Sequence, residues 1–239
     1  MEAVQTYDVR SLDRGEVLRY LGYAGQTLTE ELDARIDAGM ARCLEVARPR
    51  ACVRIFDVAE RGERDGEPVI SLAGCALELW GSSIAAHLDG AVAAAVLAVT
   101  AGMGVEAELR RLSLTDPVGQ LVLDAAGSAL VERAADAAEA SVVAAAADRG
   151  LFCSSRFSPG YGDLPLATQA PLLATLDAQR ALGITLSADY LMSPTKSVTA
   201  VVGLLTAPRE GIRASCAACP CCDFCVLRAS GRTCGAPRA

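Results

Sequence analysis

Apolar residues recur at helical spacing near the start of the chain. The stripe consists of Leu28, Leu32, Ile36, Met40 and Leu44. Spacings of three and four residues place such side chains on one face of a helix. Thr27 and Glu30 have the spacing of a capping box, which marks a helix start, and Pro49 marks its end. We therefore predict a helix over residues 27–47 with one buried face.

Short runs of Val, Ile and Leu predict strands further along the chain. Residues 51–59 and 68–80 contain such runs, and the charged segment 60–66 with its glycines separates them. This pattern is typical of two or three strands joined by a hairpin loop. Residues 184–187 and 198–205 are also apolar and suit strands.

A longer apolar passage over residues 91–105 is rich in alanine. It is shorter than the roughly 20 residues that a membrane-spanning helix needs, so we expect no membrane span. We interpret it as a buried core helix. It belongs to a helical stretch that Ser82 or Ser83 caps, that Gly90 interrupts and that runs on toward Arg111.

The sequence predicts its longest helix after Asp116 and Pro117. Asp caps helices, and Pro is tolerated at the first helical position. Alanine-rich sequence follows to about Arg149, where Gly150 ends it, and another helix is expected over residues 166–182. Strands and helices do not alternate as a parallel doubly wound sheet requires, so the pattern favours a different mixture of helices and strands.

Composition and charge limit the class of ligand. The chain has 239 residues, of which 52% are hydrophobic and only 4% aromatic, and its net charge is −7. Nucleic-acid binding relies on Lys, Arg and stacking aromatic side chains, so we expect no nucleic-acid partner. Residues 1–8 have neither the basic start nor the apolar run of a secretory signal, and we expect a cytoplasmic protein.

The end of the chain differs from the rest in charge and cysteine content. We expect residues 1–207 to form one globular body and residues 208–239 a basic tail, with five arginines against two acidic residues. The tail contains Cys216, Cys219, Cys222 and Cys225 at intervals of three, with Cys221 and Cys234 in addition. In a cytoplasmic protein this density favours a metal or redox site over structural disulfides. An iron-sulfur cluster, a zinc ion and redox-active thiols all remain open.

The remaining cysteines and the one histidine are interpreted as structural. The cysteines concerned are Cys43, Cys52, Cys75 and Cys153, which lie in apolar surroundings and are expected to pack as small hydrophobic side chains. His87 excludes a histidine-rich metal site, because the sequence contains no second histidine. We expect it to be a hydrogen-bonded structural residue next to Leu88.

The segment from Arg156 to Asp163 has the composition of a ligand-binding turn. Arg156 offers a planar set of donors that matches a carboxylate, and Gly160 lets main-chain groups approach a ligand closely. Tyr161 would add a flat wall with a polar end. An ordinary surface turn with an exposed arginine is the alternative. A second candidate, residues 193–197, could bind an anionic group or be a plain turn between strands, and we assign it no role.

These segments resemble a known family. The pattern Arg156-x-x-x-Gly160-Tyr161 is similar to the S-adenosylmethionine signature of the activation domain of cobalamin-dependent methionine synthase. Residues 191–200, 17–23 and 84–88 also resemble short stand-alone relatives of that domain. The resemblance implies an α+β fold with a curved, largely antiparallel sheet flanked by long helices.

The resemblance also implies site residues. Arg156 would pair with the carboxylate of S-adenosylmethionine, and main-chain groups from Ser158 to Gly160 would contact the ligand. Tyr161 would line it, and Glu132 would accept from its amine. In the tail, the relatives carry a similar C-x2-C-x5-C-x2-R ending, which Cys216, Cys219, Cys225 and Arg228 match.

The expected function follows from this family. The resemblance implies the activation component of a methyltransferase system, which reactivates cobalamin-dependent methionine synthase. S-adenosylmethionine would supply the methyl group, a methionine synthase or corrinoid protein would carry the cobalamin, and an electron donor would be needed. Two alternatives remain: a non-catalytic accessory protein that binds S-adenosylmethionine or a corrinoid, and an interaction module with a zinc-binding tail.

Overall fold

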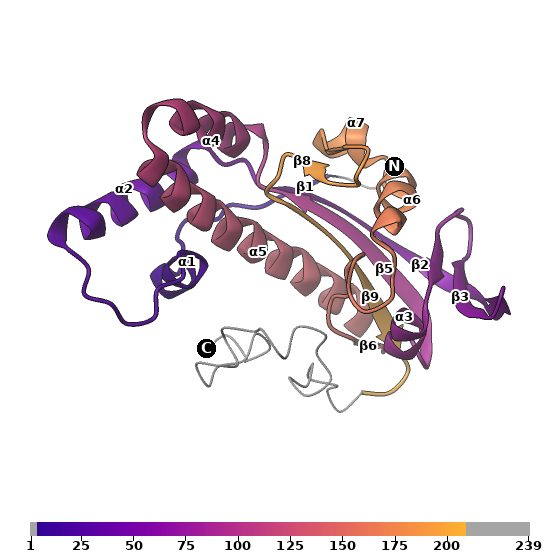
Figure 1. The fold of residues 1–239 in the computed structure, drawn as a ribbon. Helices are drawn as coiled ribbons and strands as arrows, with labels where there is room; N and C mark the ends of the chain where they lie inside the picture. The colour runs from indigo at the N-terminus through magenta and orange to yellow at the C-terminus, as the bar shows by residue number, and fades with distance from the viewer. Residues whose placement is uncertain (1–3, 209–239) are drawn as a thin grey trace.

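The computed structural model describes residues 4–208, so the tail and its predicted metal ligands Cys216, Cys219, Cys222 and Cys225 lie outside the described residues. One curved antiparallel sheet lies between two layers of helices (Figure 1). Its strands follow the order β4-β3-β2-β5-β9-β6, and β1 pairs with β2. They are β1 (Gln5–Thr6), β2 (Arg50–Arg64), β3 (Glu67–Leu72), β4 (Glu78–Trp80), β5 (Ala91–Thr100), β6 (Phe152–Cys153) and β9 (Ser197–Leu205). A separate hairpin pairs β7 (Thr185–Leu186) with β8 (Met192–Ser193).

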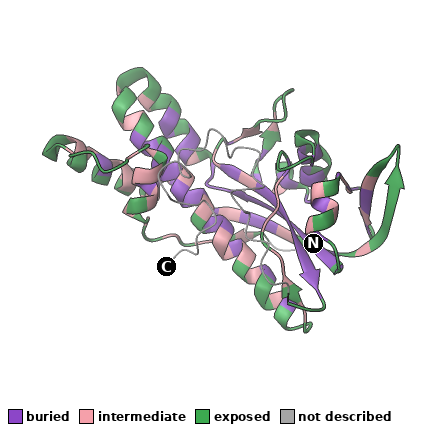
Figure 2. Cartoon of the chain, turned by 60° about the horizontal axis from the view of Figure 1, so that its bottom comes forward, coloured by how far each residue is buried: buried purple, intermediate pink, exposed green. Residues whose placement is uncertain are grey.

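The helices divide between the two faces of the sheet. One face is covered by α1 (Arg14–Tyr20), α2 (Glu30–Val46), α4 (Met103–Thr115) and the 31-residue α5 (Pro117–Ala147). The other is covered by α3 (Ser82–His87), α6 (Gln169–Thr175) and α7 (Ala178–Leu182), and residues of strands β3 and β4 belong to the same hydrophobic cluster. Each face of the sheet therefore buries its own hydrophobic cluster, as the buried residues in Figure 2 show. In the part of the chain that is described, no helix is long and apolar enough to cross a membrane.

The two long helices confirm the sequence predictions. The predicted capping box of Thr27 and Glu30 is wrong, however, because Thr29 caps α2 and its side chain accepts from the N–H of Leu32 at 3.2 Å. Asp116 caps α5 and Pro117 occupies the first turn, as expected. Residues 166–182 form a 3-10 turn (Leu166–Thr168) followed by two short helices, because Asp177 adopts a left-handed conformation between them.

The prediction of a buried helix over residues 91–105 is wrong. Residues Ala91–Thr100 form the central strand β5, which pairs with β2 on one side and β9 on the other. Ala95 packs toward α5 and Val96 toward the opposite layer. Because both faces of the strand are buried, its side chains show no alternation of apolar and polar residues, and pattern alone cannot distinguish it from a helix.

Arginines of β2 attach the outer helices to the sheet. Arg50 donates to the carbonyl of Leu182 at 3.1 Å, and Arg54 donates to that of Thr175 at 2.8 Å. Arg61 donates to the carbonyl of Leu88 at 2.8 Å. These carbonyls lie at the C-terminal ends of α7, α6 and α3, where main-chain acceptors have no partner within the helix.

Candidate functional site

The segment that carries Arg156 pairs with strand β9 through an antiparallel bridge between Phe157 and Val201. The main-chain N–H of Phe157 donates to the carbonyl of Val201 at 2.9 Å, and the N–H of Val201 donates back at 2.8 Å. Successive side chains of extended backbone point to opposite faces. Phe157 accordingly packs in the cluster beneath α3 and α6, and Arg156 points to the face that α5 covers.

Helix α3 contacts the loop that runs from Ser155 to Asp163 and contains Arg156. The carboxylate of Asp163 accepts from the main-chain N–H of Ser82 at 2.8 Å and of Ser83 at 2.9 Å. Nε2 of His87 lies 2.9 Å from the carbonyl of Ser155. The His87 ring also lies 4.9 Å from the ring of Phe157. His87 is therefore a hydrogen-bonded structural residue, as expected, and the loop is fastened to both helical layers.

The guanidinium of Arg156 contacts carboxylates from successive turns of α5. Its Nη1 donates to Glu139 at 2.7 Å, and its Nη2 donates to Asp136 at 2.9 Å and to Glu132 at 3.2 Å. Only 18% of the Arg156 side chain is exposed. The alternative of a solvent-exposed surface arginine is therefore wrong.

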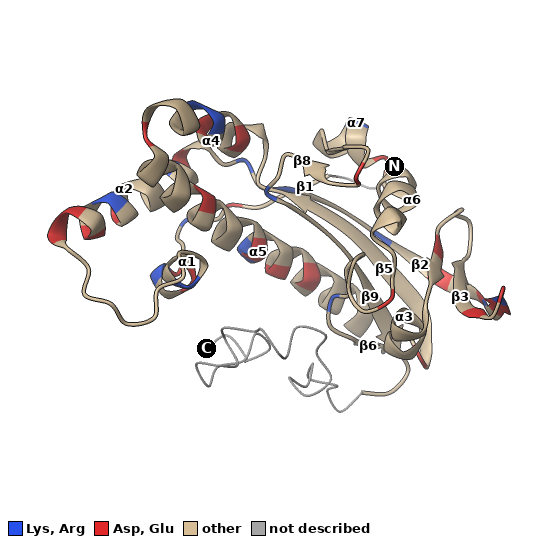
Figure 3. Ribbon diagram, in the orientation of Figure 1, with Lys and Arg blue, Asp and Glu red and all other residues tan. Residues whose placement is uncertain are grey.

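Acidic groups surround Arg156. Three carboxylates contact the one guanidinium. Figure 3 shows acidic residues along the length of α5. Burial raises the pKa of the Glu139 carboxyl, and the charge of Arg156 offsets only part of that effect. The ionised form of Glu139 is thus disfavoured by its loss of solvation.

A cavity of about 220 Å³ lies beside the guanidinium. It is lined by Glu132, Glu139, Ser155, Arg156, Ser158, Tyr161 and Val198. The structure thus brings together four residues that the sequence analysis singled out, which are Glu132 from α5 and Arg156, Ser158 and Tyr161 from the loop. The side chain of Tyr161 is at the mouth, 59% exposed. Gly160 is not among the lining residues; its φ is +90° and its N–H donates to the carbonyl of Leu164 at 2.9 Å, so it shapes the turn.

Sequence reasoning missed two of the three acidic partners of Arg156. Glu132, Asp136 and Glu139 follow one another at intervals of four and three residues, which places them on one face of a helix. That spacing was a usable signal. It shows which carboxylates lie together on α5, but it does not show which cation faces them.

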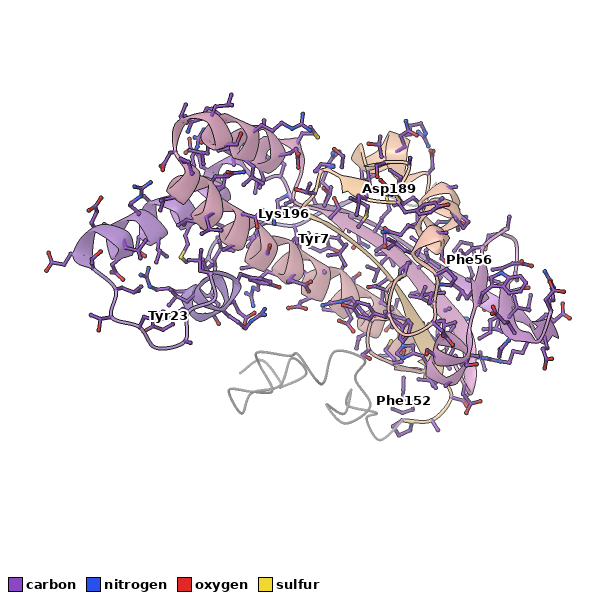
Figure 4. All side chains as sticks on the ribbon, viewed as in Figure 1. Tyr7, Tyr23, Phe56, Phe152, Asp189 and Lys196 are labelled. Atoms are coloured by element: carbon purple, nitrogen blue, oxygen red, sulfur yellow. The ribbon has the colours of Figure 1, made fainter. Side chains whose placement is uncertain are left out.

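A second hollow adjoins the first along α5. It encloses about 500 Å³ between residues 7–11 of the N-terminal segment and Arg133, Asp136 and Ala137 of α5. Asp136 links the two hollows, because it lines this one and binds Arg156 of the other. The label of Tyr7 in Figure 4 marks where the N-terminal segment passes α5.

In the second candidate segment, residues 193–197, the polar groups of Thr195 and Lys196 bond to side chains of α4 and α5. The carboxylate of Glu106 accepts from the N–H and the hydroxyl of Thr195, at 2.9 and 2.8 Å. Nζ of Lys196 lies 2.8 Å from Asp124 and 2.9 Å from Ser128, both in α5 (Figure 4). These contacts favour the interpretation as a structural turn.

No group of three or more His, Cys, Asp or Glu residues between residues 4 and 208 is arranged to hold a metal ion. The cysteines in this range are Cys43, Cys52, Cys75 and Cys153, all buried or half-buried, as expected. Burial raises the pKa of the Cys43 thiol to about 12. That thiol is therefore neutral and unreactive at physiological pH.

Comparison with known proteins identifies the fold. No protein-family model matches the chain, and no curated protein matches it. Among solved structures, the chain is similar to the crystal structure of the MetH reactivation domain bound to AdoHcy, with a TM-score of 0.61 and 15% sequence identity. The likeness covers 97% of this chain and 86% of that one. The expected α+β fold, with its curved antiparallel sheet and long helices, is therefore confirmed.

Proposed function

We propose that this protein binds S-adenosylmethionine beside Arg156 and serves in the reductive reactivation of a cobalamin-dependent methionine synthase. The observation that carries this proposal is the cavity in which Arg156, Glu132, Ser158 and Tyr161 meet. The solved structure with the same fold is bound to AdoHcy, the demethylated form of the proposed ligand, which supports a site for an adenosyl ligand of this class.

The amino-acid end of the ligand matches the charged groups of the cavity. A carboxylate could bind the guanidinium of Arg156, whose Nε donates to none of the described residues and whose Nη1 has one N–H to spare. The ligand's ammonium would bind Glu132, which makes the longest of the three bonds to Arg156, at 3.2 Å. Binding would then replace the ion pair between Glu132 and Arg156 with two others, one between Arg156 and the ligand's carboxylate and one between Glu132 and the ligand's ammonium.

The rest of the ligand needs more room than this cavity offers. Sites for ligands of this size usually enclose about 300–1,000 Å³, and the cavity beside Arg156 has only about 220 Å³. The adjoining hollow has about 500 Å³ and is lined by Asp8, whose carboxylate suits the hydroxyl groups of a ribose. We therefore propose that the nucleoside lies along residues 7–11 and the methionine end beside Arg156.

The protein's part in reactivation is to hold and orient the ligand. Cobalamin on a partner protein, once reduced by one electron, would take the methyl group of the sulfonium. Arg156 and Glu132 would fix the methionine end, and Tyr161, exposed at the mouth of the cavity, would cover it when a partner docks. We further propose a methionine synthase or corrinoid protein as that partner, acting in the cytoplasm.

Calorimetric titration with S-adenosylmethionine tests the binding site. Arg156→Ala should abolish measurable binding, whereas Arg149→Ala, which removes an arginine that pairs with Asp57 of β2, should leave it unchanged. Equal affinities of the two variants and the unmodified protein would contradict the site. Thermal unfolding of both variants serves as the control for folding.

A single-turnover assay separates reactivation from accessory binding. The protein would be mixed with a cob(II)alamin-loaded methionine synthase, a low-potential reductant and S-adenosylmethionine labelled on its methyl group. Transfer of the label that depends on this protein supports reactivation. Binding without transfer supports the accessory protein, and zinc in the purified protein without binding supports the interaction module.

For the tail we propose a metal centre held by Cys216, Cys219, Cys222 and Cys225, with an iron-sulfur cluster favoured over zinc. Thiolates at this spacing bind either metal. The test is iron, zinc and sulfide analysis of anaerobically purified full-length protein, with absorption spectra, beside the Cys216→Ser and Cys225→Ser variants. A preparation without iron, sulfide or zinc would contradict the proposal.

A further inference from the structure

Two large apolar side chains are exposed at the end of the sheet where β9 ends. Phe152 of β6 is 45% exposed and Val92 of β5 is 43% exposed. Leu205, the last residue of β9, is paired with Phe152 on one side and with Ala91 on the other. Phe152 and Val92 therefore lie on the two strands that flank the end of β9.

The chain leaves the sheet between these two strands. Residues 206–208 are exposed, and residues 209–239 follow them in the sequence. Figure 4 shows Phe152 beside the end of the described ribbon. A segment tethered this close to a surface has an effective concentration on the order of millimolar there. Apolar contacts too weak to hold a separate protein can therefore hold the segment that follows Pro208.

The sequence of that segment suits an apolar surface. Apart from alanine, proline and cysteine, its apolar residues are Ile212, Phe224, Val226 and Leu227, and the last three fall within residues 224–227. An aromatic and two aliphatic side chains in one short stretch can cover an exposed Phe and Val, which removes apolar area of both partners from water.

Charge favours this segment over a second copy of the chain as the occupant of the surface. Residues 209–239 contain five arginines and two acidic residues, a net charge of +3, so that the whole-chain charge of −7 leaves −10 on the remainder. A basic segment is attracted to an acidic body, whereas two copies that each carry −7 repel one another.

We propose that residues 209–239 dock onto the surface formed by Phe152 and Val92, with residues 224–227 as the apolar contact. Phe152 begins the extended segment that runs along β9 and leads to Arg156. The docked segment is thus held at the base of the Arg156 loop. This docking requires neither a bound metal nor S-adenosylmethionine, so it goes beyond the proposed function and can be tested separately from it.

The direct test puts the photoreactive residue p-benzoylphenylalanine in place of Phe152 in the full-length protein. We expect irradiation to join it to residues 209–239 of the same chain, without a change in the mass of the monomer, as mapped by mass spectrometry. The matched control carries the same group in place of Leu121, which is 60% exposed near the start of α5 and about 40 Å along the helix from its other end. That position should give no such cross-link.

Two outcomes of this test would overturn the proposal. Cross-links from position 152 to another chain would show that a second copy covers the surface. Cross-links to residues 209–239 that are absent, or equally frequent from positions 152 and 121, would show that the segment has no preference for this surface.

Tryptic cleavage gives a second measurement on the full-length protein. Phe152→Ser and Val92→Ser should each speed cleavage after Arg228 by about threefold or more, because the docked segment is released more often. Leu121→Ser should leave the rate unchanged, and the melting temperatures of all three variants control for folding. If the three variants and the unmodified protein are cleaved after Arg228 at one rate, this surface does not hold the segment and the inference is wrong.

Discussion

The carboxylate of Asp163 caps helix α3 from a distant part of the chain, with an oxygen 2.9 Å from the main-chain nitrogen of Ser83. The residue at the start of that helix is Gly81, which has no side chain to cap it. The Arg156 loop therefore completes α3, and α3 in return fixes the end of the loop.

Replacing Asp163 should loosen the helix and the loop together. We expect Asp163→Ala to lower the free energy of unfolding by about 1 kcal/mol, the usual effect of losing a cap, and to weaken S-adenosylmethionine binding. Urea denaturation and calorimetry measure the two effects. Asp13→Ala is the control, because Asp13 caps α1 in the same way, 2.7 Å from the N–H of Gly15. It should lower stability without changing affinity; equal losses of affinity would refute the coupling.

Gly162 should tolerate substitution less well than other glycines with positive φ. Its φ is +54°, and a Cβ there would lie 2.6 Å from the Cβ of Ser83. Gly150 has a φ of +69° with nothing within 4 Å of the same position. Both Ala variants incur the backbone penalty of about 1 kcal/mol, but only Gly162→Ala must also displace α3. We expect it to unfold at clearly lower urea concentration than Gly150→Ala, and a common midpoint would contradict this.

Removing Arg156 should destabilise the protein more at high pH than at low pH. Arg156→Ala removes the charge that offsets the desolvation of Glu139 and leaves that carboxyl facing Asp136 and Glu132, which raises the folded-state pKa of Glu139 further. A carboxyl with a raised folded pKa favours the folded state at low pH, and this contribution is lost as pH rises through that pKa. We expect a loss of about 1–3 kcal/mol at pH 8 because the network is half-buried. Denaturation at pH 5 should show a smaller loss.

The Glu108 carboxyl of α4 contributes to stability in the opposite sense, because its folded-state pKa is lowered rather than raised. Hydrogen bonds from Arg111 and Arg42 lower its pKa from 4.5 to about 2, and its side chain is only 7% exposed. A lowered folded pKa stabilises the protein above pH 4.5, and this stabilisation disappears as pH falls toward 2. Glu108→Gln should therefore lower the melting temperature at pH 7 and have little effect near pH 2.

The comparison for that variant is Glu45→Gln. Glu45 also pairs with Arg42, at 2.8 Å, but its side chain is largely exposed. An exposed pair contributes about 0–1 kcal/mol, so this variant should melt close to the unmodified protein at every pH. If Glu108→Gln lowers the melting temperature by the same amount at pH 7 and near pH 2, the lowered pKa of Glu108 is not the cause of the loss.

The sequence predicts those parts of the fold whose signals are local. The cap formed by Asp116 and Pro117 and the apolar stripe that includes Ile36 each depend on a few neighbouring residues, and α5 and α2 follow from them. Strand β5 could not be predicted in this way. Its alanines favour a helix in isolation, and only pairing with β2 and β9 makes them extended.

The same distinction applies to the candidate site. Arg156 and Tyr161 belong to one turn, and the turn's composition indicated a ligand. The contacts of Arg156 with Asp136 and Glu139 join a loop to helix residues that lie 20 and 17 positions earlier in the chain. Such contacts depend on how β9 packs against α5, which no short pattern records. The pairing of Arg156 with these carboxylates could therefore not be predicted from the sequence.

The attachment of the Arg156 loop to α5 on one side and to α3 on the other should make affinity at the proposed S-adenosylmethionine site sensitive to how the two helical layers are positioned relative to each other across the sheet. A change under α3, for instance at the buried Ile84, would shift Ser83 and with it the Asp163 end of the loop. Substitutions that touch no ligand atom can thus tune binding.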